Sequence, residues 1–225
     1  MAGKTGGATP VEYSNSEEIV SSITHGIGVG LGAAGLIVLV TLAGLAGDGW
    51  RVVSFSIYGA TLVLLYLSSL LYHSVRTPRA KRFFRYFDHA SIFLLIAGTY
   101  TPFTLISLRG WWGWALFALI WIMAITGIVL TFVLMDRSRL LAGILYITMG
   151  WLVIIAVKPL LNAVPRAGVL WLLAGGLAYT FGVVFYLWKR LPFNHAIWHL
   201  FVMGGSLCHF FAVYYGVLPF TAPIS

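Results

Sequence analysis

Charged residues are scarce in this chain: Asp, Glu, Lys and Arg together make up 9% of its 225 residues. A soluble domain carries about 25% charged residues. Cysteine is nearly absent, and the single Cys208 excludes a disulfide within the chain. Hydrophobic residues account for 60% of the sequence. This composition excludes an ordinary soluble domain and indicates a polytopic membrane protein.

Acidic residues are the rarer charged type, with six Asp and Glu against 14 Lys and Arg, for a net charge of +8. An excess of this size can indicate a nucleic-acid partner. Here, however, the basic residues are scattered between apolar runs, where they serve as topology signals beside anionic lipid. We therefore expect no nucleic-acid partner, and membrane lipids as the partners; the sequence does not predict an oligomeric partner.

Seven apolar segments are long enough to cross a bilayer, which takes about 20 residues per helix. They are residues 19–46, 51–74, 85–107, 112–134, 139–159, 168–188 and 195–217. The sequence therefore predicts an all-α integral membrane protein with seven transmembrane helices. Its parts are a short cytoplasmic segment 1–18, a transmembrane domain 19–217 and a short external tail 218–225. Residues 1–16 lack the basic leader of a secretory signal, so we expect the first span to be retained.

The distribution of Lys and Arg predicts the orientation. One side of the membrane would carry ten of them and the other side four. The ten are Lys4, Arg76, Arg79, Lys81, Arg82, Arg85, Arg137, Arg139, Lys189 and Arg190, and the four are Arg51, Arg109, Lys158 and Arg166. This asymmetry predicts a cytoplasmic N-terminus and an external C-terminus, in a multi-pass protein of the bacterial plasma membrane.

Histidines in three spans form a candidate metal site. His195 and His199 are four residues apart, so they share one face of a helix. His73 closes the second span and Asp88 opens the third, and the topology puts all four groups at one depth on the cytoplasmic side. Ionisable groups inside a membrane are costly and usually functional. We predict that His73, His195 and His199 bind Zn²⁺, although three imidazoles also suit copper, nickel and iron.

Two further residues are candidates for catalysis. Asp88 can accept a hydrogen bond from a water on the metal or orient an imidazole, and can then move a proton. Ser69 lies four residues before His73, on the same helical face. Zinc lowers the pKa of its water to about 7, which supplies hydroxide at neutral pH. The alternative interpretation is that these histidines form hydrogen bonds that hold helices together.

The remaining histidines are weaker candidates. His25 lies in the first span on the same membrane side, where it either lines a cavity or packs against a neighbouring helix. His89 follows Asp88 directly and points about 100° away from it, which favours a structural role. His209 lies about 15 Å along the helix from His199, too far for the same ion, but it can polarise a deeper cavity.

Other features predict local structure rather than chemistry. Glu17 and Glu18 favour the N-terminus of the first helix electrostatically. Pro102 predicts a kink in the third span. Small residues spaced for close helix packing occur in the first span at Gly26, Gly28, Gly30, Gly32 and Gly35.

Four stretches carry a family resemblance: EEIVSSITHGIG, YLSSLLYHS, FDHASIFLLIAGTYTPF and HAIWHLFVMGGSLCHFFAV. Together they resemble the hemolysin III family, the bacterial branch of the progestin and adipoQ receptor group. That group belongs to a wider superfamily of membrane hydrolases that includes alkaline ceramidases. The resemblance implies seven helices, an intracellular N-terminus and zinc held by His73, His195 and His199, with Ser69 and Asp88 in the shared polar set.

Three functions are compatible with these features. The first is a zinc-dependent hydrolase of lipid amides or esters, and a role in lipid homeostasis is about equally compatible. The second is a pore-forming cytolysin, which the family name suggests but the apolar spans support poorly. The third is a non-enzymatic sensor of membrane state with a structural zinc.

Overall fold

The computed structural model describes residues 13–134 and 139–219, and within these ranges the chain is helical with no strand. Seven helices are long and apolar enough to span a membrane, which confirms the predicted class. Arg137, Lys4 and the outer parts of both terminal segments lie outside the described residues. The elements are α1 (Asn15–Leu45), α2 (Gly49–Ser74), α3 (Pro78–Pro102), η1 (Phe103–Ser107), α4 (Trp111–Leu134), α5 (Arg139–Gly150), η2 (Leu152–Ala156), α6 (Val157–Ala163), α7 (Arg166–Leu187) and α8 (Asn194–Gly216).

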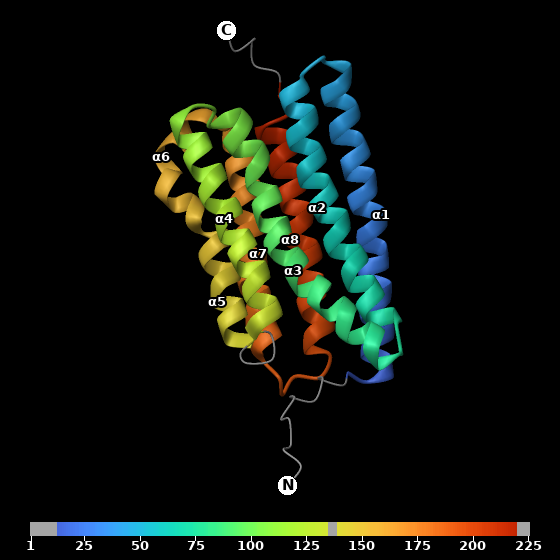
Figure 1. The fold of residues 1–225 in the computed structure, drawn as a ribbon. Helices are drawn as coiled ribbons and strands as arrows, with labels where there is room; N and C mark the ends of the chain where they lie inside the picture. The colour runs from blue at the N-terminus through green and yellow to red at the C-terminus, as the bar shows by residue number, and fades with distance from the viewer. Residues whose placement is uncertain (1–12, 135–138, 220–225) are drawn as a thin grey trace.

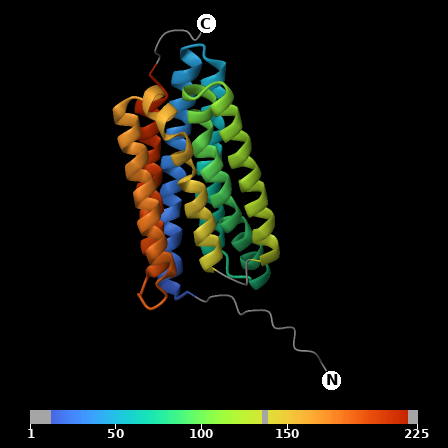
Figure 2. The ribbon, with the colours of Figure 1, turned by 90° about the vertical axis from the view of Figure 1, so that its left-hand side faces the viewer.

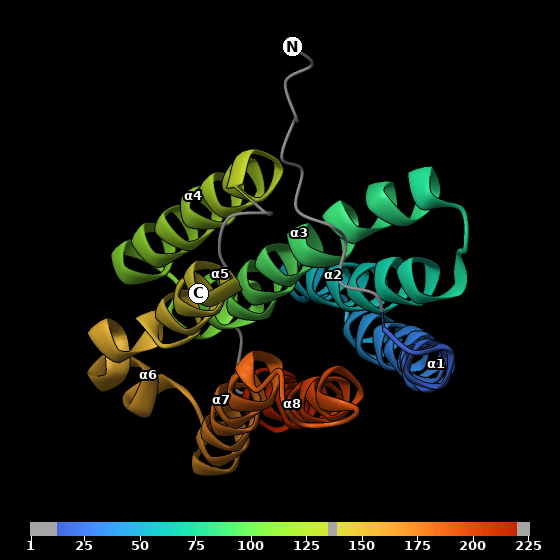
Figure 3. The same ribbon diagram turned by 90° about the horizontal axis from the view of Figure 1, so that it is seen from below.

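The spans run side by side as an up-and-down bundle (Figures 1 and 2). Neighbours in sequence pack against each other most extensively, in the pairs α1–α2, α2–α3 and α7–α8, and α8 also contacts α1. Figure 3, from below, shows α8 between α7 and the pair α1 and α2. The start of α1, the turn from α2 to α3 and the start of α8 therefore lie at the same end, the lower one in Figure 1.

Helix α1 begins four residues earlier than the predicted span, because a capping box starts it. The Ser14 side chain accepts a hydrogen bond from the Glu17 amide, and the Glu17 carboxylate accepts one from the Ser14 amide. This pattern satisfies two backbone donors that the first helical turn leaves free. Glu17 is thus occupied at the helix terminus, as the sequence predicted, while Glu18 points elsewhere.

Helix α3 begins at Pro78, before the predicted start of the third span at residue 85, so most of the basic run that precedes residue 85 is helical. Proline at the first helical position is favourable, because its missing N–H would have had no partner and its φ angle already suits a helix. Consequently Lys81 and Arg85 extend from an ordered helix. The predicted kink at Pro102 coincides with a change of helix type, since the five-residue π-helix η1 follows it.

The fifth predicted span is interrupted. A 3₁₀ segment, η2, separates α5 from α6 just after Gly150. Pro159 has no N–H to donate to the carbonyl of Ile155, and it lies in the first turn of α6, where a helical N–H has no partner within the helix. The α-helix therefore starts again after η2 and does not run on from α5. The Tyr100 hydroxyl of α3 compensates, donating to the carbonyl of Gly150 and accepting from the amide of Val153, both at 2.9 Å.

The predicted close packing of α1 is confirmed at particular glycines. A Cβ atom on Gly28 would lie 2.5 Å from Cδ1 of Tyr66 on α2, and one on Gly32 would lie 3.5 Å from the side chain of Leu62. Gly30, in contrast, has open space around it. The buried face of α1 therefore carries Gly28 and Gly32, and the same face bears His25 one turn earlier.

Candidate metal centre

Three histidines converge in the interior at the lower end of the bundle. His73 is the penultimate residue of α2, and His195 and His199 occupy the first two turns of α8. All three are buried. The Nε2 atoms of His195 and His73 are 3.3 Å apart, and those of His199 and His195 are 3.1 Å apart. The ligand atoms of all three lie within 4.8 Å of one another, so the group can hold a metal ion.

These separations fit a zinc ion. Nitrogen ligands at 2.0–2.1 Å from tetrahedral zinc lie about 3.3 Å from one another. Hydrogen bonding alone accounts for the cluster poorly. A ring nitrogen carries either one hydrogen or one lone pair in its plane, so Nε2 of His195 makes one good hydrogen bond, not two. A cation shared by the three nitrogens satisfies both contacts at once.

The start of α8 is fixed by an unusual backbone conformation. Phe193, at the N-cap, has φ 57° and ψ 21°, and it is the one non-glycine residue with positive φ in the described parts of the chain. Bulky residues avoid this region, and such conformations cluster at functional sites. The Asn194 side chain also donates to the carbonyl of Phe185 at 3.1 Å, which ties the first turn of α8 to α7. Both features set the position of His195.

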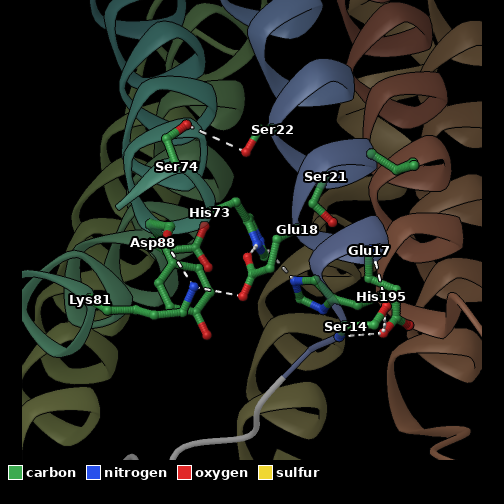
Figure 4. Close-up of polar contacts among 12 residues, drawn as sticks. Ser14, Glu17, Glu18, Ser21, Ser22, His73, Ser74, Lys81, Asp88 and His195 are labelled. Carbon is green, nitrogen blue, oxygen red and sulfur yellow. Dashed lines mark hydrogen bonds and ion pairs between the residues drawn. The ribbon is translucent and has the colours of Figure 1, made fainter. Parts of the chain in front are cut away.

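Glu18 of α1 contacts the cluster, a role that the sequence did not reveal. Its Oε2 lies 2.7 Å from Nδ1 of His73, and its Oε1 lies 2.6 Å from Nζ of Lys81 (Figure 4). The available signal was helical periodicity. Glu18 lies seven residues before His25, two turns along one face, whereas the adjacent Glu17 points about 100° away.

Two aromatic rings enclose the histidines. His25 of α1 stacks on His199, with ring centroids 3.6 Å apart and planes inclined by 20°. Tyr13 stacks on His195 at 4.6 Å. His25 is 3% exposed, and neither of its ring nitrogens has a hydrogen-bond partner among the described residues. Both roles left open for His25 are observed, because it packs against a neighbouring helix and also lines the cavity described next.

A cavity of about 380 Å³ begins at the cluster. His25, Asp88, His89, His195 and His199 contribute to its wall. The rest is mostly apolar and extends between α3, α5, α7 and α8 to Phe103 and Leu160. Its wall residues Ile154 and Leu161 are more than half exposed, so part of the wall is also outer surface of the bundle. This shape suits a long apolar ligand whose polar end meets the histidines.

Asp88 is 7% exposed and lies beside the histidines on the cavity wall, as the topology predicted. Ser69 is fully buried one turn from His73, but it is not among the cavity-lining residues. Its hydroxyl has no hydrogen-bond partner within the described chain. The catalytic roles of Asp88 and Ser69 therefore remain predictions.

The other two histidines also line the cavity. Nδ1 of His89 lies 3.0 Å from the carbonyl of Arg85 and 3.5 Å from the carboxylate of Asp88. His209 lies deeper, with Nε2 3.3 Å from the carbonyl of Leu172 and outside the three-histidine group. His209 therefore lines the deeper cavity, while its polarising role stays a prediction, and His89 faces the cavity in addition to its contact with the Arg85 carbonyl.

Fold and site together define a seven-helix membrane protein with a buried group of three histidines at the end of an internal cavity. Residues 13–210 match the family described as Haemolysin-III related, and the chain belongs to this family. It is 50% identical over 203 residues to Hemolysin-3 of Bacillus cereus, covering 90% of this chain and 93% of the relative. Identity to the Hemolysin-3 homolog of Bacillus subtilis (strain 168) is 47% over 201 residues, covering 89% and 94%.

A more distant relative extends the similarity to animals. The human Monocyte to macrophage differentiation factor is 30% identical over 176 residues, covering 76% of this chain and 73% of the relative. No solved structure matches the chain. The predicted membership of the hemolysin III family is therefore confirmed, as is a multi-pass membrane location.

Proposed function

We propose that this protein is a zinc-dependent hydrolase of lipid amides or esters. The observation that carries the proposal is the convergence of three buried imidazoles, two of which, His195 and His199, line a mainly apolar cavity. Such a cavity accepts acyl chains and excludes water from them. The excess of basic residues supports a cytoplasmic N-terminus, which puts the histidines near the cytoplasmic face.

The division of work follows from the histidine group and from the side chains on the cavity wall beside it. His73, His195 and His199 would hold the ion, which when bound polarises a carbonyl and acidifies a water. Asp88 accepts the proton that the attacking water loses and returns it to the leaving group, a task for a carboxylate beside the metal. His25 has unpartnered ring nitrogens on the same wall, so it can hydrogen-bond the polar end of the substrate.

The printed name of the Bacillus cereus relative, Hemolysin-3, favours a second candidate, a pore-forming cytolysin. An aqueous pore needs a polar lining. The cavity wall is mainly apolar away from the histidines, so a single bundle supports this function poorly. Dye release from liposomes by purified protein, with a reproducible single-channel conductance, would favour the cytolysin instead.

The first test is metal content per chain in protein purified without metal-affinity resin or added zinc. Near one zinc per wild-type chain, and little in a His195→Ala variant, would support the site. Hydrolysis of ceramides and other lipid amides in mixed micelles then tests the reaction, with Asp88→Asn as the metal-retaining control. Zinc without hydrolysis would favour a sensor or lipid-homeostasis role with a structural metal, and no zinc would exclude the mechanism.

A further inference from the structure

Glu18 and Lys81 form an ion pair, and the same Glu18 carboxylate also contacts His73 of the histidine cluster. We propose that Glu18 is a positioning residue of the metal centre, that Lys81 holds it in place, and that the metal affinity depends on both. This inference rests on the proposed metal site but not on hydrolysis. Two contacts of the Glu18 carboxylate support it (Figure 4). Nζ of Lys81 lies 2.6 Å from Oε1 of Glu18, and Nδ1 of His73 lies 2.7 Å from Oε2.

The first consequence concerns the tautomer of His73. An ionised carboxylate only accepts hydrogen bonds, so Nδ1 of His73 must donate. In the neutral ring the lone pair then lies on Nε2, the atom that faces Nε2 of His195 at 3.3 Å. Glu18 thereby presents the metal-binding form of His73 toward the other two histidines. A hydrogen bond of this kind also raises the basicity of a ligand imidazole.

The second consequence concerns the position of the ring. Glu18, His73 and Lys81 come from three helices, α1, α2 and α3. Lys81 is itself fixed, since its Nζ lies 3.4 Å from the Tyr72 carbonyl and 4.9 Å from the centre of the Tyr72 ring. The Glu18 and Lys81 side chains are 15% and 25% exposed, and the His73 side chain is fully buried. The pair therefore closes the cluster on the side facing the membrane surface.

The competing explanation is that Glu18 and Lys81 only hold three helices together. A structural ion pair of this type stabilises the fold but leaves metal affinity unchanged, so the two explanations predict different measurements. Glu17 provides the matched control, because it is the same residue type at the next position and its carboxylate serves the helix cap instead.

The experiment measures zinc affinity of the full-length protein in detergent, by competition with a chromophoric chelator. Glu18→Gln keeps the shape of the side chain but loses its charge, and should weaken zinc binding about 10- to 100-fold, the usual effect of losing such a partner. Lys81→Met should weaken it by a smaller factor, and Glu17→Gln should leave it within about twofold. The visible spectrum of the Co²⁺-loaded protein should change in Glu18→Gln and stay unchanged in Glu17→Gln, because it reports ligand geometry.

Zinc affinity within twofold of wild type in Glu18→Gln, with an unchanged Co²⁺ spectrum, would overturn the positioning role. If Glu18→Gln does not fold, Lys81→Met decides alone: unchanged affinity overturns the proposal and weakened affinity supports it. Absence of zinc binding in the wild type would overturn both this inference and the proposed hydrolase. Zinc binding that depends on Glu18, without any lipid hydrolysis, would remove the hydrolase and leave this inference standing.

Discussion

The two ends of the bundle both carry buried charged or titratable groups, but they satisfy them differently. At the end opposite the histidines, the Arg51 guanidinium pairs with the adjacent Asp48 and donates to the Val217 carbonyl at 3.0 Å. At the histidine end, three ring nitrogens face one another at 3.1 and 3.3 Å. The buried Arg51 guanidinium thus finds its acceptors within the chain. Three facing ring nitrogens can hold a cation between them, so the comparison separates a structural lock from a candidate metal site.

The largest expected effect comes from removing a ligand at the histidine end. His195→Ala should lower zinc affinity by more than about 100-fold, since even loss of a supporting partner costs 10- to 100-fold. Lipid hydrolysis should fall to background with it. His209→Ala is the matched control on the same helix, because His209 lies outside the three-histidine group. Zinc content by mass spectrometry of the metal checks the prediction, and equal loss in both variants would contradict it.

At the same end of the bundle, a substitution of Asp88 should separate zinc binding from catalysis, with a smaller effect. Asp88→Asn keeps the size of the side chain but cannot take up a proton, so kcat for lipid hydrolysis should fall about 10²- to 10⁴-fold. Zinc content should remain near that of the wild type, because the three histidines remain. Parallel assays of metal content and turnover check this. A variant with wild-type kcat would remove Asp88 from the mechanism.

The sequence predicted the grouping of the three histidines at this end better than the contacts that support them. His73, His195 and His199 could be grouped because span order and the i to i+4 spacing determine depth and face. Glu18 could not be assigned in the same way. A glutamate near a helix N-terminus has an adequate local explanation, and only the packing of α1 against α2 shows that its carboxylate reaches His73.

The errors in the fold have a similar origin. The third span was predicted to begin at residue 85, after the basic run that starts at Arg76, but Pro78 starts a helix through that run. The interruption at η2 depends on Pro159 and on a compensating hydroxyl from Tyr100, which lies about 50 residues away in sequence. Hydropathy locates a span, whereas its breaks and ends depend on single residues and on partners brought near by the fold.

At the opposite end, a substitution should change stability and leave the metal unaffected. Arg51→Met removes the ion pair with Asp48 and the hydrogen bond to the Val217 carbonyl that joins α2 to the end of α8. Losing hydrogen bonds from a charged, largely buried group costs about 1.5–3 kcal/mol. We expect a lower Tm in detergent with zinc content unchanged. Loss of zinc in this variant would contradict the separation between the two ends.

The smallest expected effect is the pH dependence of the stability that Asp48 contributes at the Arg51 end of the bundle. Partial burial works to raise the pKa of Asp48, but hydrogen bonds from the Arg51 amide and guanidinium, and the positive charge, outweigh it and hold the pKa below its ordinary value. Because the folded-state pKa is the lower one, Asp48 contributes stability above its unfolded pKa of about 3.9, and this contribution is lost as the pH falls through the folded pKa.

Asp48→Asn should therefore lower Tm slightly at pH 7, and the gap from wild type should narrow progressively as the pH falls below about 4. Both proteins are measured metal-free, in a chelator, so that release of zinc from the histidines at low pH does not contribute. A gap that is the same at pH 7 and pH 3 would show that the charge of Asp48 does not contribute to the lock. The hydrogen bonds from Arg51 to carbonyls just after α8 would then account for the lock better than its ion pair, and the two ends would differ less than their geometry indicates.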